Sequence, residues 1–126
     1  ATGAGLYRIP MTTIYKICPR ALWRDAVAEG RLAGAPIDHA DGFIHFSTAE
    51  QVAETACRHF AGVADLVLLS VRAAELGDAL RYEPSRGGAL FPHLYGALPL
   101  SAVGSVADLP LGPDGRHAFP PGILPA

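Results

Sequence analysis

Five segments of the chain carry the apolar patterns that are typical of β-strands. The segment DLVLLSVR at 65–72 is a continuous apolar run, which predicts a strand covered on both faces. The segment 43–46 alternates after an Asp-Gly turn, so that His45 shares one side with Phe43 and Ser47. The other predicted strands are TIYKI at 13–17, LRYEPS at 80–85 and SAVGSVADLP at 101–110.

Two segments have the periodicity of amphipathic helices. The first helix is predicted at 19–30, with Gly30 as its C-terminal cap. The second is predicted at 49–60, and the letters STAEQ before it offer two capping-box registers. One register starts at Ser47 and the other at Thr48. Both predicted helices directly follow a predicted strand.

The predicted elements define a class of fold and a domain organisation. Residues 31–42 are polar and punctuated by Gly and Pro, which predicts a loop between the first helix and the second strand. The order β-α-β-α-β-β-β favours an α+β fold over a doubly wound sheet. We expect a disordered leader or tag at 1–12, a single α+β domain at 13–110, and a poorly packed Pro- and Gly-rich tail at 111–126.

Charge and cysteine content narrow the expected partners. The net charge is -2 and no run of basic residues occurs, so duplex nucleic acid is not an expected partner. Single nucleotides stay open as ligands, because one or two arginines can hold a phosphate. No segment approaches the ~20 consecutive apolar residues of a membrane helix, so no membrane partner is expected. Cys18 and Cys57 form no CxxC motif, which indicates free thiols and a cytoplasmic protein.

Two clusters of residues that could carry chemistry lie on the first two predicted strands. The first cluster is Tyr15 with Lys16. The second is His45 with Ser47. His45 is either a histidine hydrogen-bonded at the edge of the core, or a pocket histidine that contacts a ligand or transfers a proton near neutral pH. The nearby polar Asp41 favours the pocket.

A third cluster extends from the strand at 80–85 into RGGALFPHLYG. Glu83 is either a solvated residue at a strand end or a carboxylate that orients a sugar hydroxyl or stabilises a cationic transition state. His93 is presented by a loop that Pro92 stiffens, which favours function. Packing of the neighbouring apolar and aromatic residues, Tyr95 among them, is the competing interpretation.

These clusters give a set of candidate residues. Arg81 and Arg86 could bind a phosphate through two hydrogen bonds each. We predict a catalytic role for His45, Glu83 and His93. We predict a ligand-binding role for Tyr15, Lys16, Ser47, Arg81, Arg86 and Tyr95.

The remaining histidines are weaker candidates. His39 and His117 lie in segments predicted to be loop and tail, and His59 is expected on the outer face of the second helix. A metal site is not predicted. The side chains of His45, Glu83 and His93 are acceptable ligand types, but their spacing supports no metal site.

The chain resembles the domain of unknown function 952 family across residues 13–107. The motifs DGFIHFS and FPHLYG carry the resemblance, together with IYKI, DLVLLSV and LRYE. That family is distantly similar to the ADP-ribosyltransferase fold, which has split, curved, mostly antiparallel sheets around an NAD-binding cleft, here with two main helices. IHFS is similar to a strand of the RNA 2′-phosphotransferases. The resemblance therefore implies that His45 and Ser47 line the cleft and that Glu83 lies near the position of a catalytic glutamate.

The resemblance implies a protein that binds NAD or an ADP-ribose-like nucleotide, with NAD as a substrate and an ADP-ribosyl- or phosphotransferase-like activity. Tyr15 and Lys16 would hold one side of the ligand. His45 would contact ribose hydroxyls, and Glu83 or His93 would polarise the reacting centre. Lys16 stands where those enzymes commonly carry histidine or arginine, which favours a non-catalytic module that binds a small ligand or a protein. A metal-dependent hydrolase is a third hypothesis.

Overall fold

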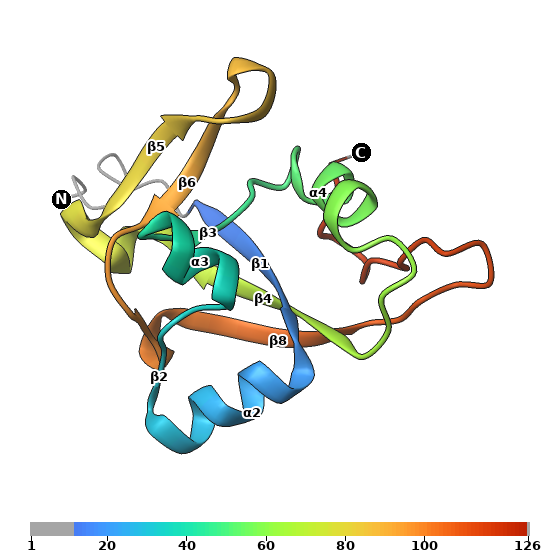
Figure 1. Cartoon of the computed structure of the whole chain (residues 1–126), viewed down its shortest axis with the longest axis horizontal. Helices are drawn as coiled ribbons and strands as arrows, with labels where there is room; N and C mark the ends of the chain where they lie inside the picture. Colours follow the sequence, from blue (N-terminus) through green and yellow to red (C-terminus); the bar gives the residue numbers. More distant parts are fainter. Residues whose placement is uncertain (1–11, 126) are drawn as a thin grey trace, which may run out of the picture.

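The computed structural model describes residues 12–125 and arranges them as small antiparallel sheets with short helices (Figure 1). This arrangement confirms the predicted α+β class with antiparallel sheets. The predicted leader, residues 1–12, lies outside the described residues except for Thr12.

The central sheet joins three strands that are far apart in the sequence. It consists of β1 (Thr13–Pro19), β4 (Leu66–Arg72) and β8 (Val103–Leu109), all antiparallel, with β4 in the middle. The three strands confirm the predictions at 13–17, 65–72 and 101–110. The last strand begins later than predicted, because Leu100–Ala102 forms a 3₁₀ turn, η3.

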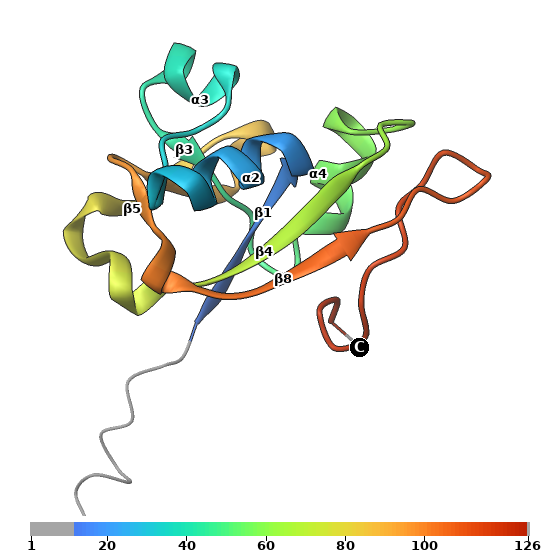
Figure 2. The ribbon, with the colours of Figure 1, turned by 90° about the horizontal axis from the view of Figure 1, so that it is seen from below.

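The central strand β4 is buried on both faces, as its continuous apolar run predicts. On one face Val67, Leu69 and Val71 join a core cluster that includes Ala26 of α2 (Arg20–Glu29). On the other face Leu66 and Leu68 pack in a cluster with Val52 and Ala56 of α4 (Val52–His59). Figure 2 shows α2 and α4 beside these strands.

A second three-stranded sheet lies beside the first and supplies part of the pocket. Its order is β3 (Ile44–His45), β6 (Leu90–Leu94) and β5 (Leu80–Pro84), all antiparallel. The register places His45 opposite His93, and His93 opposite Arg81, so these three side chains form one row across the sheet. The helical turns η1 (Ala73–Ala79) and η2 (Arg86–Gly88) precede β5 and β6 respectively.

The segment 31–42 is not the loop that its composition predicts. It contains β2 (Arg31–Leu32), which pairs with β7 (Leu98–Pro99), and the helix α3 (Pro36–Asp41). Pro36 suits the first position of a helix, where a missing N–H loses no hydrogen bond. Gly42 ends α3 at a φ of 87°, which glycine adopts without steric strain. The elements are short, so periodicity alone does not reveal them.

One of the two hydrogen bonds of the second capping register is present before α4, although the N-cap of the helix is Gln51 and no side chain caps it. The side chain of Gln51 accepts a hydrogen bond from the backbone N–H of Thr48 at 3.1 Å. The register starting at Ser47 is wrong, because the Ser47 hydroxyl instead pairs with Thr55 Oγ1 at 3.0 Å. The helix α4 begins at Val52, three residues later than predicted. The helix α2 begins at Arg20 rather than at residue 19, because residue 19 completes β1.

The C-terminal segment packs better than its Pro and Gly content predicts. Phe119 and Ile123 lie against the core cluster beneath α4. His117 Nε2 lies 2.7 Å from the carbonyl oxygen of Val63, and Leu111 bridges to His117. Apolar anchors spaced along the segment therefore outweigh its lack of regular secondary structure.

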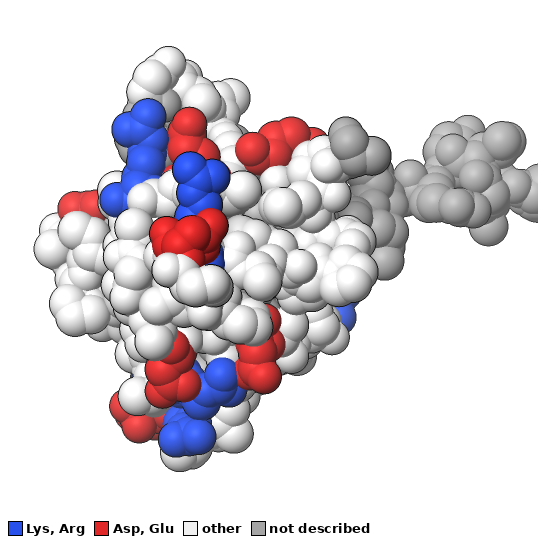
Figure 3. Space-filling model, turned by 90° about the vertical axis from the view of Figure 1, so that its right-hand side faces the viewer, with Lys and Arg blue, Asp and Glu red and all other residues white. Residues whose placement is uncertain are grey.

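The described helices are short, and the visible surface carries mixed charges. Within residues 12–125 no helix is long and apolar enough to cross a membrane. Figure 3 shows one face of the molecule, where basic and acidic side chains lie interspersed among uncharged ones. The charges on this face are therefore mixed rather than gathered into a patch of one sign.

The core packing predicts a large effect at Leu69, which is fully buried in the centre of β4. Leu69→Ala is expected to lower the free energy of unfolding by about 2–5 kcal/mol, because it removes buried methyl groups and leaves a cavity. Val27→Ala on the exposed side of α2, where the side chain is 54% exposed, is the control and should change it by less than about 0.5 kcal/mol. Urea unfolding measures both; equal effects would contradict the packing.

Candidate functional site

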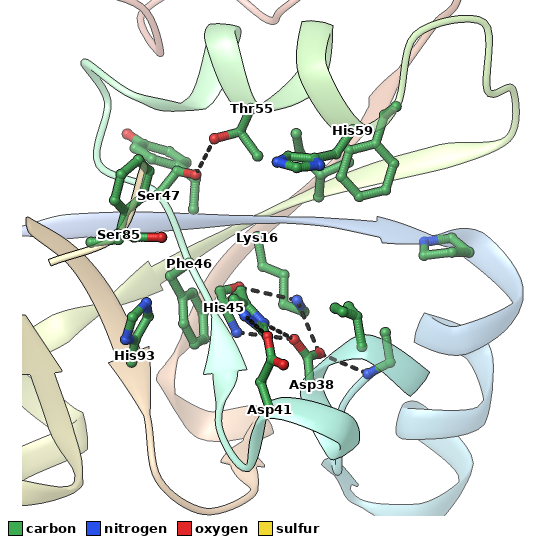
Figure 4. Close-up of a pocket in the computed structure, with 17 residues that line it drawn as sticks. Lys16, Asp38, Asp41, His45, Phe46, Ser47, Thr55, His59, Ser85 and His93 are labelled. Carbon is green, nitrogen blue, oxygen red and sulfur yellow. Dashed lines mark hydrogen bonds and ion pairs between the residues drawn. The ribbon is translucent and has the colours of Figure 1, made fainter. Parts of the chain in front are cut away.

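A pocket of about 570 Å³ opens where β1, α3, β3, α4 and the β5–β6 hairpin meet (Figure 4). Its volume lies in the range of small-molecule sites. Five of the candidate residues line it, and they come from three segments that are distant in the sequence. These residues are Tyr15, Lys16, His45, Ser47 and His93.

Asp38 of α3 is the hub of the polar side of the pocket, although only 2% of it is exposed. Its Oδ2 accepts the backbone N–H of Ala35 at 2.7 Å and lies 3.2 Å from Lys16 Nζ. Its Oδ1 accepts the backbone N–H of His45 at 3.1 Å and lies 2.6 Å from His45 Nδ1. One buried carboxylate thus ties β1, α3 and β3 together.

Both ring nitrogens of His45 are held by carboxylates. Nδ1 contacts Asp38, and Nε2 lies 2.8 Å from Oδ2 of Asp41, one helical turn further along α3. Two ionised carboxylates accept hydrogen bonds from both nitrogens only when the imidazole carries both N–H groups. Lys16 Nζ also donates to the backbone carbonyl of His45 at 3.0 Å. His45 is therefore a clamped side chain on the pocket wall.

The environment of Asp38 favours its ionised form. Burial acts to raise the pKa of this carboxyl group. The hydrogen bond from His45, the charge of Lys16 and the backbone N–H groups act in the opposite direction and outweigh burial, so the pKa of Asp38 lies well below its usual range. The Lys16–Asp38 pair is accordingly a buried ion pair.

A second carboxylate–histidine pair lies on the β5–β6 hairpin. Oε1 of Glu83 accepts a hydrogen bond from His93 Nδ1 at 2.8 Å and from the hydroxyl of Tyr95 at 2.7 Å. These hydrogen bonds, that of Tyr95 first, lower the pKa of Glu83, and the Glu83 carboxylate in turn raises the pKa of Tyr95. Glu83 and Tyr95 are not among the residues that line the pocket, so they stand behind His93.

Phe43 joins the two carboxylate–histidine pairs. Its ring stacks on His93 with centroids 4.0 Å apart and lies 4.7 Å from His45 and 5.4 Å from Tyr95. The centroids of the two histidine rings are 5.7 Å apart. This aromatic packing fixes both imidazoles side by side on one face of the second sheet.

The hydroxyl side of the pocket is built by β1 and α4. Tyr15 and Ser47 exchange two backbone hydrogen bonds of 2.8 Å, which bring the end of β3 against β1. Thr55 Oγ1 donates to the carbonyl oxygen of Gln51, so the Ser47 hydroxyl can donate to Thr55. Ser47, only 4% exposed, is thereby held in place on the pocket wall.

Of the two candidate phosphate-binding arginines, Arg81 is not among the residues that line the pocket. The guanidinium of Arg81 lies over the ring of Tyr95, 5.0 Å from its centroid. The side chain of Arg86 lies outside the described part of the chain. Lys16, the basic residue on the pocket wall, is paired with Asp38.

Sequence reasoning missed several residues of the site, among them Asp38 and His59. In the sequence Asp38 is one of several acidic residues in a segment predicted to be a loop. The only indication that it lies in the first turn of a helix is the Ala-Pro pair that begins three residues earlier. His59 was expected on the outer face of its helix, but it is an exposed residue that lines the pocket one turn after Thr55. Both depend on how α3 and α4 dock, which local patterns do not encode.

Clusters of possible metal ligands and the two cysteines were the remaining chemical features of the described residues. Among residues 12–125, no three His, Cys, Asp or Glu side chains converge in a manner that could hold a metal ion, so the hydrolase hypothesis gains no support. Cys18 and Cys57 are free thiols. Burial raises the pKa of Cys18 to about 11, which keeps this thiol un-ionised and a poor nucleophile.

The fold and the pocket define an α+β protein with two carboxylate-paired histidines beside a small-molecule-sized pocket. The family described as protein of unknown function (DUF952) matches residues 17–106, and the chain belongs to this family. The resemblance read from DGFIHFS and FPHLYG is thereby confirmed at the level of the family. None of the curated proteins matches the chain.

Solved structures of one bacterial protein are similar to this chain. The crystal structure of protein CC0527 from Caulobacter crescentus is 54% identical, covers 85% of this chain and 94% of its own, and superposes with a TM-score of 0.82. The solution NMR structure of CC0527 is 56% identical over 84% of this chain and 91% of its own, with a TM-score of 0.76. The similarity supports the fold and brings no activity with it.

The ion pair of Asp38 predicts a strong loss of stability on removal of its charge. Asp38→Asn leaves the Lys16 ammonium buried without its counter-charge and should lower the free energy of unfolding by about 3–5 kcal/mol. Asp41→Asn, at a carboxylate that is 44% exposed, is the control and should lose less than about 1 kcal/mol. Urea unfolding at neutral pH measures both, and recovery by adding Lys16→Met would confirm the cause.

The lowered pKa of Asp38 also predicts a pH dependence. The unfolded carboxyl binds a proton near pH 4, whereas the folded one holds its charge to lower pH. The stabilisation is therefore complete above about pH 5 and is lost as the pH falls toward the folded pKa. The gap in unfolding free energy between wild type and Asp38→Asn should narrow as the pH falls from about pH 5 to about pH 2.5. A gap that stays constant over this range would exclude the assignment.

Proposed function

We propose that the pocket binds a small ligand that combines an aromatic ring with hydroxyl groups, of the class of NAD or an ADP-ribose-like nucleotide. The observation that carries the proposal is the convergence of Tyr15, Lys16, His45, Ser47 and His93 on one pocket of about 570 Å³. Apolar and aromatic walls with a few fixed polar groups are the usual composition of such sites.

The distribution of polar groups supports recognition of the sugar and base rather than of phosphate. The Lys16 ammonium is already paired with Asp38, and Arg81 stacks on Tyr95 away from the wall. Ser47 and His93 line the wall and can exchange hydrogen bonds with hydroxyl groups. Phosphate groups of a bound nucleotide would then project out of the pocket.

The similarity to the ADP-ribosyltransferase fold belongs to the same proposal. Two antiparallel sheets that meet at a pocket support a split-sheet architecture around a ligand cleft. An ADP-ribosyl- or phosphotransferase-like activity on this ligand is the catalytic form of the hypothesis. The free thiols Cys18 and Cys57 support a reducing compartment such as the cytoplasm for the protein.

A non-catalytic binding module is the second candidate, and the geometry of His45 favours it. Asp38 and Asp41 occupy both nitrogens of His45, so this residue cannot transfer a proton unless Asp41 moves. Turnover of bound NAD distinguishes the two candidates. Release of nicotinamide by the wild-type protein supports the transferase-like form, and tight binding without release supports the module.

Titration calorimetry with NAD, ADP-ribose and adenosine tests the proposal. We expect measurable binding below millimolar concentration. Ser85→Trp, which places a large side chain at the pocket wall outside the Asp38 network, should weaken binding at least about tenfold, or about 1.4 kcal/mol. Val27→Ala, on the exposed side of α2, should bind like the wild type. Absence of binding of all three ligands at millimolar concentration would remove this ligand class.

A further inference from the structure

Of the three histidines that line the pocket, His45 and His93 are each paired with a carboxylate and differ in what the second ring nitrogen can do. His45 has a carboxylate on each nitrogen, Asp38 on one side and Asp41 on the other. His93 has a carboxylate on Nδ1 alone, and among the described residues no hydrogen bond engages its Nε2. His93 nonetheless lines the pocket, and Figure 4 shows its ring beside Phe46.

The Glu83–His93 contact decides where the proton of the neutral imidazole resides. An ionised carboxylate only accepts hydrogen bonds, so Nδ1 of His93 must carry the proton and donate the hydrogen bond to Glu83 Oε1, 2.8 Å away. Nε2 is then left with a lone pair. Phe43 stacks on the ring and Tyr95 holds the other side of the same carboxylate oxygen, so the imidazole cannot turn freely.

We propose that Nε2 of His93 accepts a hydrogen bond, and then the proton, from a hydroxyl group of the pocket ligand, and that Glu83 positions the imidazole for this step. The inference rests on the proposed function, because it needs a hydroxyl-bearing ligand in the pocket. The O–H bond of the ligand breaks as the N–H bond to Nε2 forms, and the electron pair stays on the ligand oxygen. The Glu83 carboxylate offsets the positive charge that the imidazole gains.

The charges around His93 are compatible with this role. Glu83 and Arg81 face it from β5, His45 faces it from β3, and Tyr95 lies on its own segment beyond β6. Arg81 is held over the ring of Tyr95, so the nearest charge to the imidazole is the Glu83 carboxylate. Glu83 is a positioning residue, because it does not line the pocket.

Histidine ring ¹⁵N NMR tests the positioning without any ligand. At a pH where His93 is neutral, we expect its proton on Nδ1 and an unprotonated Nε2, the reverse of the tautomer that free histidine prefers. Glu83→Ala should abolish this preference, and Glu83→Gln should restore it, because the amide oxygen still accepts the Nδ1 proton. Tyr95→Phe, which removes the other hydrogen bond to Glu83, is the matched control and should leave the tautomer unchanged. A proton on Nε2 in the wild type would overturn the inference.

The same spectra recorded with saturating NAD or ADP-ribose test the contact. The Nε2 resonance of His93 should shift on binding, and Glu83→Ala should weaken binding about tenfold while Glu83→Gln stays near the wild type. Binding of a ligand without a shift of the His93 Nε2 resonance would contradict the inference but would be consistent with the proposed function. If neither ligand binds, the proposed ligand class fails, and the tautomer experiment still decides whether Glu83 sets the state of His93.

Discussion

The buried carboxylate of Asp38 is the interaction on which the pocket depends. A charge that is 2% exposed is tolerated only when partners replace the water it has lost. Those partners are the ammonium of Lys16, the ring and backbone of His45, and the backbone N–H of Ala35. They come from β1, β3 and the start of α3, so satisfying one charge fixes three elements that the hydrophobic core alone would leave free to shift.

The two carboxylate–histidine pairs serve different purposes although they lie side by side. Asp38 is buried and its histidine is clamped at both nitrogens, which is a structural arrangement that holds α3 over the pocket. Glu83 is partly exposed and its histidine keeps one nitrogen toward the cavity. Phe43 contacts both histidine rings, so the rigid Asp38–His45 pair supports the ring of His93 through Phe43. A fixed scaffold next to a group with remaining hydrogen-bonding capacity is the arrangement that binding and catalysis both require.

Local patterns predicted the elements that are long and whose burial is one-sided or complete. The run at 65–72 became β4 with both faces covered, and Gly30 ended α2 in the left-handed conformation. The six-residue α3 and the two-residue β2 were not predicted, because they are too short for periodicity to reveal. The prediction that His93 lies in a loop was wrong, because its segment pairs with β5 and β3 as strand β6. For the site, the motif residues His45 and His93 were recognised, whereas Asp38 was not. Its importance arises from being carried inward by α3, which no spacing in the sequence expresses.

The charge balance of the pocket constrains what the family fold can do in this chain. The only lysine of the sequence forms an internal ion pair with Asp38. Its ammonium group therefore stabilises the fold rather than binding an anionic ligand. The wall also presents serine and threonine hydroxyls, histidine nitrogens and aromatic surface. Groups of this kind distinguish ligands by the number and direction of their hydroxyls and by ring stacking, because a missing hydroxyl would leave a buried polar group unpaired. Specificity in this pocket would therefore come from contacts with the uncharged part of the ligand. Any contact with a phosphate group would have to be made by the β5–β6 hairpin outside the pocket.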